Sequence, residues 1–209
     1  MKSLIWKEFR LVQSRWQKTL LILFILGALS IYATVSLKTL SIPMKFNFIL
    51  GVTSIIFMSE IVFESIKSDK SNKTLEKLLP LFSVEKIILA KTLFGMVTAT
   101  LVSIIYSMVF FIYFVILKSF PNFEMLISIS LLPLINLLFG NIFTVLVLLI
   151  DNMFVTKILT MIGTILYILL FSNSTNFVLI IISIGTLFIV AVLLNIVIKK
   201  RSIENIFEM

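Results

Sequence analysis

One charged segment interrupts an otherwise almost continuous series of apolar stretches, and this contrast limits what the chain can fold into. Residues 63–91 read FESIKSDKSNKTLEKLLPLFSVEKIILAK and carry six of the eighteen basic residues. Hydrophobic residues make up 60% of the 209 residues and charged residues only 13%. The charged fraction of a soluble domain is about 25%. The sequence therefore predicts an integral membrane protein with one long charged loop.

Six apolar stretches are long enough to cross the hydrocarbon core, which takes about 20 helical residues. Helices are expected because unpaired sheet edges cannot face lipid, and because no alternating strand pattern of about ten residues occurs. The expected spans are residues 19–37, 46–63, 92–117, 125–150, 154–171 and 177–198. We therefore predict an all-α membrane protein in which residues 19–198 form one six-span unit.

The distribution of basic residues predicts the orientation. Fifteen of the eighteen fall in the N-terminal segment 1–18, in the loop 64–91, at Lys157 and in the tail 199–209. An excess of Lys and Arg is typical of cytoplasmic loops. The bias towards Ile, Lys, Asn and Phe fits an AT-rich bacterial genome. We expect a bacterial cytoplasmic membrane protein with both termini inside. Its net charge of +8 reflects this topology and favours anionic lipid, and it does not indicate nucleic-acid binding.

The composition excludes several kinds of chemistry. The chain has no Cys and no His, so disulfides, thiol nucleophiles, His-ligated zinc and Ser–His–Asp triads are impossible within it. The ten acidic residues are scattered, and none of the six glycines begins a GxxxxGK[ST] loop. We expect no enzyme activity, no metal and no cofactor in this chain.

The N-terminal segment 1–18 has the pattern of a basic amphipathic helix. Its apolar stripe, at spacings of four, three and four, consists of Ile5, Phe9, Val12 and Trp16. Such a helix lies in the membrane interface. Two interpretations stay open: a basic anchor that only enforces the topology, or an elbow helix that touches a cytoplasmic partner and transmits movement to the first span.

Two acids stand at the end of the second expected span. Glu60 and Glu64 are one helical turn apart and share a face. An acid within reach of lipid costs a few kcal/mol unless it snorkels or pairs. We interpret Glu60 as reaching the inner interface, with Lys67 or Lys91 as its partner. The alternative is that Glu60 and Glu64 belong to a gate or to a path for substrate or ions.

The sequence TLEKLL at residues 74–79 predicts a short helix with Thr74 as its N-cap. Pro80 ends it, and a new helix begins near residue 83 and continues into the third span. Its apolar ridge is Leu75, Leu78 and Leu79, and its exposed helix formers are Glu76 and Lys77. Outside the membrane this ridge has nothing of its own to pack against. We expect it to lie on lipid or to dock in a groove of another protein.

The order of these parts resembles the ABC-2 type permeases, the membrane subunits of one large group of ABC transporters. Those chains have a basic elbow helix, six spans, an acid near the end of the second span, a Thr-Leu-Glu-x-Leu-Leu coupling element, a Pro and a Lys. The matching residues here are Glu64, Thr74, Leu75, Glu76, Lys77, Leu78, Leu79, Pro80 and Lys91. The family usually has Gly where this chain has Lys73, and its Pro usually falls where this chain has Phe82. The outer loop 172–176 is also shorter than in larger relatives.

This resemblance implies a permease subunit of an ATP-driven exporter of a peptide, drug or lipid-like cargo. ATP and Mg would bind a separate ATPase subunit, on which the coupling residues 74–79 would dock. A second copy, or a similar permease chain, would complete the translocator. We expect Leu78→Arg to abolish docking without unfolding the bundle.

The fourth expected span contains Pro133, Asn136 and Asn141 in the sequence LLPLINLLFGN. Pro133 should kink the helix, and the two Asn side chains either bond across helices or line a path. Two other functions stay open for the whole chain. A membrane subunit for vitamin uptake would need an outer pocket, for which the outer loops are short. An immunity or assembly protein would need neither the TLEKLL ridge nor the elbow helix.

Overall fold

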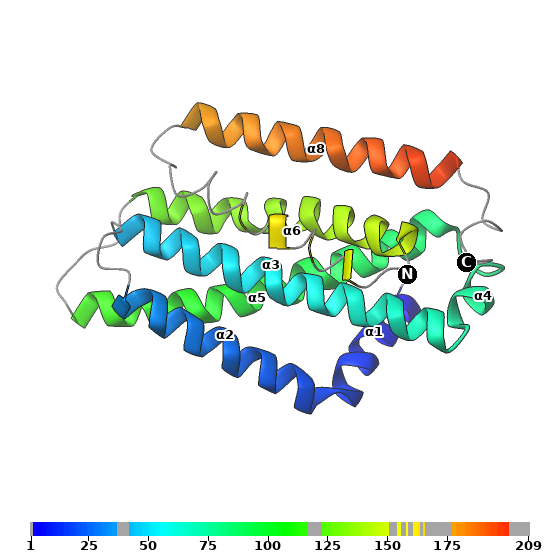
Figure 1. The fold of residues 1–209 in the computed structure, drawn as a ribbon, viewed down its shortest axis with the longest axis horizontal. Coiled ribbons are helices and arrows are strands. Elements are labelled where there is room, and N and C mark those ends of the chain that lie inside the picture. Colours follow the sequence, from blue (N-terminus) through cyan, green and yellow to red (C-terminus); the bar gives the residue numbers. More distant parts are fainter. Residues whose placement is uncertain are drawn as a thin grey trace.

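The computed structural model describes residues 2–36, 42–116, 123–150, 154–155, 158, 161–163, 165 and 177–200. Throughout these residues the regular structure is α-helix, which confirms the all-α class for this part of the chain. The elements are α1 (Lys2–Ser14), α2 (Trp16–Ser36), α3 (Ile42–Ser71), α4 (Thr74–Leu78), α5 (Val84–Ile116), α6 (Phe123–Leu149) and α8 (Phe177–Lys200) (Figure 1).

Several of these helices are long and apolar enough to cross a membrane. Four qualify by themselves within the described residues: Lys45–Ser71, Val84–Ile112, Met125–Leu149 and Ile181–Lys199. Helices α1 and α2 qualify together as a pair bent by 77°, which makes five at most. The expected span 154–171 lies mostly outside the described residues, and so does the tail from residue 201. The chain has the helices of a multi-pass membrane protein.

Two predicted boundaries are wrong. Trp16 was expected on the N-terminal helix, but the chain bends at Arg15 and Trp16 is the first residue of α2. The second helix was expected to end near residue 63, but α3 continues to Ser71, so the connection to α5 is shorter at its start; α5 begins at Val84, as expected near residue 83. The charged residues near the ends of α3 and α5 therefore stand on long helices rather than in a loop.

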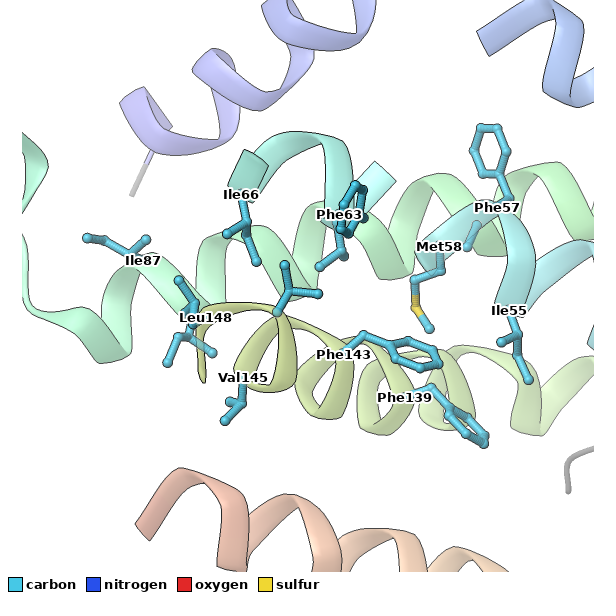
Figure 2. Packing of buried hydrophobic residues seen from close by; sticks show 14 of the residues in the cluster. Ile55, Phe57, Met58, Phe63, Ile66, Ile87, Phe139, Phe143, Val145 and Leu148 are labelled. Atoms are coloured by element: carbon cyan, nitrogen blue, oxygen red, sulfur yellow. The ribbon is translucent and has the colours of Figure 1, made fainter. Parts of the chain in front are cut away.

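Helices α3, α5 and α6 pack against one another and form the centre of the bundle (Figure 1). Helix α8 packs on α6, and α2 packs on α3. Two glycines bring the central helices close together. A Cβ on Gly140 would lie 3.1 Å from Sδ of Met58, and a Cβ on Gly95 would lie 3.1 Å from Cγ2 of Val62. Met58 of α3 points into the core beside Phe139 and Phe143 of α6 (Figure 2).

Helix α4 packs on this same core, contrary to the expectation that its ridge has no partner within the chain. Leu75 is only 2% exposed, and Leu78 and Leu79 pack half-buried against the same cluster. Leu78→Arg would therefore be expected to disturb the packing of the bundle, so this substitution does not test docking alone.

The N-cap of α4 is Lys73 rather than the predicted Thr74. Lys73 has φ 50° and ψ 27°, and among the described residues it is the only one other than glycine with a positive φ. Its N–H bonds to the carbonyl of Lys70 at 3.2 Å, which closes the turn after α3 and folds α4 back onto that helix. Helix α4 ends at Leu78, before Pro80 as expected.

Candidate functional site at the α4 end of the bundle

Helix α1 lies against α5 and α3 at the end of the bundle that carries α4 (Figure 1). The predicted apolar stripe faces largely outward, since Phe9 is 51% and Trp16 is 57% exposed, while Val12 is half-buried. Ile5 is also on the exposed side. The face that packs on the bundle carries Glu8, whose burial the apolar stripe did not predict.

Four charged side chains meet beneath α1, and we name them the buried quartet: Lys7, Glu8, Asp69 and Lys91. The Nζ of Lys91 donates to Oε1 of Glu8 at 2.9 Å and to Oδ2 of Asp69 at 2.6 Å. Lys7 donates to the other carboxylate oxygen of Asp69. The hydroxyl of Ser65 accepts a further bond from Lys91. Helices α1, α3 and α5 are thereby joined at one point.

Burial makes the buried quartet sensitive to the loss of any member. The side chains of Lys91, Glu8 and Asp69 are only 2%, 4% and 1% exposed, and that of Lys7 is 29% exposed. A charge without solvent is tolerated only when it is paired and hydrogen-bonded. Two cations face two carboxylates, so the quartet is neutral as a whole. It fixes α1 to the two helices that α4 connects.

A second set, which we name the half-exposed quartet, lies at the bend between α1 and α2. It consists of Arg15, Lys18, Glu60 and Glu64. Lys18 contacts Glu60 at 2.7 Å, and Glu64 accepts hydrogen bonds from both Arg15 and Lys18. The side chains of Arg15 and Lys18 are 40% and 45% exposed. Glu60 and Glu64 thus share a face of α3, as their spacing predicted.

The predicted partners of Glu60, Lys67 and Lys91, are wrong. Lys18 is its partner, because the 77° bend brings the start of α2 beside α3. Lys91 is already engaged by Glu8 and Asp69. A sequence clue to Glu8 existed, since it is the one acid among the five basic residues of 1–18.

A cavity of about 40 Å³ lies between the bend and α3. The half-exposed quartet lines one part of it, and apolar side chains such as Ile22 and Phe57 line another. A cavity needs roughly 10–15 Å³ to hold one water molecule. It therefore has room for water that hydrates the half-exposed quartet. In the described part of the chain, no group of three or more acidic side chains is placed to hold a metal ion.

The polar residues of α6 contact neighbouring helices. Asn136 is fully buried, donates to the hydroxyl of Thr100 at 2.9 Å and accepts from Ser54. Oδ1 of Asn141 accepts from Nδ2 of Asn195 at 2.6 Å. Helix α6 continues through Pro133. These bonds favour the packing interpretation of the two Asn residues, and a path-lining role stays a prediction.

Comparison with protein-family models, with curated proteins and with solved structures finds no match for this chain. Fold and site together define a multi-helix membrane protein whose N-terminal helix is fixed by ion pairs across one end of the bundle.

Proposed function

We propose that this chain is a permease subunit of an ATP-driven transporter of the ABC-2 type. In this proposal the bent pair α1–α2 and residues 154–171 complete six spans. Helix α1 is the elbow helix, and α4 with its flanking turns is the coupling element. The observation that carries the proposal is the buried quartet, which ties α1 to α3 and α5. Displacement of α4 by a partner would therefore also move α1, and through the bend it would move α2.

The lengths of the connected helices support a mechanical role. Helix α3 has 30 residues and α5 has 33, so each is about 45–50 Å long at 1.5 Å per residue. The hydrocarbon core is about 30 Å thick. In this proposal both helices continue beyond the hydrocarbon core as rigid arms, and α4 joins their ends. A force on α4 acts on both arms together.

The backbone of Lys73 also supports the resemblance on which the proposal draws. ABC-2 permeases usually have Gly at this position, and here the sequence departs from the pattern. Lys73 nevertheless adopts φ 50°, a left-handed conformation that glycine reaches without steric cost. A glycine would fit this backbone position. The turn at Lys73 therefore has the conformation that the family's usual glycine would adopt.

The proposed mechanism assigns nucleotide chemistry to another chain. A separate ATPase subunit would bind ATP and Mg and close around the nucleotide. This chain would supply the docking surface and the moving helices. ATP can shift the bundle between two packings only through unequal binding to the two states. A second copy of this chain, or a similar permease, would complete the path for an amphipathic cargo.

The first test is purification of the tagged chain from its own host in a gentle detergent. We expect a chain with a phosphate-binding loop to co-purify in fixed stoichiometry and to hydrolyse ATP. The same tag on an unrelated multi-pass protein from that host serves as the control. If the intact complex contains only copies of this chain, even after mild cross-linking in the membrane, the proposed function is wrong.

A further inference from the structure

Helix α2 is held to the bundle along one narrow line near its middle. Among the side chains of α2 that the structure describes, residues 16–32, only Leu26 is fully buried. Phe24, on the opposite face, is 80% exposed. A single buried side chain does not fix the angle at which α2 crosses its neighbours, because apolar contacts are not directional.

Tyr106 of α5 adds one directed contact to this line. Its hydroxyl donates to the backbone carbonyl of Leu23. Its ring lies against Gly27, one turn further along α2, where a Cβ would be 3.3 Å from Cε1 of the tyrosine. Tyr106 also packs on the apolar cluster around Met58 and on the cluster around Phe46. A tyrosine hydroxyl among apolar side chains keeps its partner, because an unpaired one is costly there. This contact therefore fixes one point of α2 to the centre of the bundle.

Between this point and the bend, a cavity separates α2 from α3. Ile22 of α2 and Phe57 of α3 line this cavity of about 40 Å³. The two helices diverge towards α1 (Figure 1). The start of α2 is held to α3 by the half-exposed quartet, and partly exposed ion pairs of this kind contribute little to stability. The start of α2 therefore has room to move and is held by charges that water can solvate.

The contact with Tyr106 divides α2 into two arms of similar length. Gly27 comes eleven residues after the first residue, Trp16, and nine residues before the last, Ser36. At 1.5 Å per residue each arm is roughly 14–16 Å long. A rigid helix that turns about such a point moves its two ends in opposite directions.

We propose that Tyr106 and Gly27 form a pivot on which α2 rocks, so that separation of its start from α3 brings its end towards the bundle. The buried quartet keeps α1 in place, and the bend at Arg15 takes up the change of angle. This inference does not require the proposed function, which would only supply the force that moves the start of α2.

Distances between spin labels test the opposite movement of the two ends. The chain has no Cys, so each label goes to one introduced Cys. One label replaces Gln17 or Tyr32, which are exposed on either side of the pivot, and the second replaces Leu134, an exposed residue of α6. The double substitution Glu60→Gln and Glu64→Gln releases the start of α2 in the purified chain in lipid nanodiscs.

We expect this double substitution to lengthen the distance from position 17 to position 134 and to shorten the distance from position 32 to position 134. Position 17 is ten residues from Gly27 and position 32 is five. For a rigid helix the shortening should therefore be about half of the lengthening.

Substitutions at the pivot test whether this contact couples the two ends. Gly27→Leu places a side chain against the ring of Tyr106, and it should move α2 off the core and lengthen both distances. Gly185→Leu is the control, since a Cβ there would have nothing within 4 Å, and it should change neither distance. Tyr106→Phe removes only the hydroxyl, and together with the double substitution it should abolish the shortening. If the shortening persists, Tyr106 is not the pivot.

Three further outcomes would overturn the proposal. A longer distance at position 17 with an unchanged one at position 32 would mean that α2 bends at Gly27. Lengthening of both distances in the double variant would mean that α2 leaves the core as one body. If neither distance changes, even with Ile22→Trp in the cavity to push the start of α2 outward, α2 is fixed to the core. None of these results depends on an ATPase, so this inference and the proposed function fail separately.

Discussion

The buried quartet and the half-exposed quartet each set two cations against two carboxylates, but they differ in their access to water. The side chains of Lys91 and Asp69 are 2% and 1% exposed, whereas those of Arg15 and Lys18 are 40% and 45% exposed. Removing one partner from a buried ion pair typically costs about 3–5 kcal/mol. An exposed pair contributes only about 0–1 kcal/mol. The same set of charges therefore fixes α1 at one point and leaves its bend adjustable at another.

This difference suits the proposed role of α1, the transmission of movement to α2. In the proposed mechanism the contact of α1 with α5 would stay closed while the bend at Arg15 opens, because water and the adjacent cavity can solvate the half-exposed quartet when its pairs separate. The following changes test whether solvent exposure, rather than charge number, separates the two quartets.

The largest effect is expected for Lys91→Met, which removes the central cation of the buried quartet and leaves Glu8 and Asp69 with Lys7. We expect the free energy of unfolding to fall by about 3–5 kcal/mol. Fluorescence reports this change, since Trp6 precedes Lys7 on α1 and Trp16 directly follows the bend.

The control for this prediction is Lys86→Met, the same substitution at an exposed lysine on the same helix. A surface change of this kind should alter stability by no more than about 0.5 kcal/mol. If Lys91→Met unfolds under the same conditions as Lys86→Met, the buried quartet does not fix α1.

A smaller effect is expected for Glu64→Gln in the half-exposed quartet. Lys18 retains Glu60 and Arg15 is 40% exposed to solvent, so the loss of stability should be at most about 1 kcal/mol. Hydrogen exchange should nevertheless accelerate at the amides around Arg15, because the bend opens more often. A loss as large as that of Lys91→Met would remove the distinction between the two quartets.

High salt should reduce the loss of stability caused by Glu64→Gln and should not reduce the loss caused by Lys91→Met. At 1 M ionic strength the Debye length is about 3 Å, so exposed charges are screened while buried pairs are not. We expect the cost of Glu64→Gln to fall towards zero in 1 M sodium chloride and the cost of Lys91→Met to remain. Parallel unfolding curves at low and high salt measure both.

The smallest effect is expected at Lys73, where the backbone rather than the charge sets the energy. The left-handed conformation costs a residue with a Cβ roughly 1–2 kcal/mol, and glycine loses about 0.5–1 kcal/mol more entropy on folding. Lys73→Gly should therefore stabilise the fold slightly, and Lys73→Ala should not. A Gly variant that unfolds at a lower midpoint than the Ala variant would show that φ at this residue carries no cost, because only the entropy loss of glycine would then remain.

The sequence predicted the features that depend on local patterns. Composition and apolar length identify a membrane protein of helices, Pro80 marks the end of α4, and the four-residue spacing places Glu60 and Glu64 on one face. Features that depend on distant contacts were missed. Spacing shows that Leu75 and Leu79 share a face, but it does not show what covers that face. The pairing of Glu8 with Lys91 depends on the 77° bend, for which residues 1–18 carry no local pattern.

The positions of these pairs along the chain also set an order of assembly during synthesis. Residues emerge from the N-terminus onwards at about 5–20 per second. Glu60 and Glu64 are made before Lys91, so Arg15 and Lys18 find their partners first, and Glu8 meets Lys91 roughly one to several seconds later at this rate. Until the start of α5 has been synthesised, Glu8 lacks Lys91, the lysine with which it pairs. The first helix to be synthesised thus reaches its final position only after the start of α5 has been made.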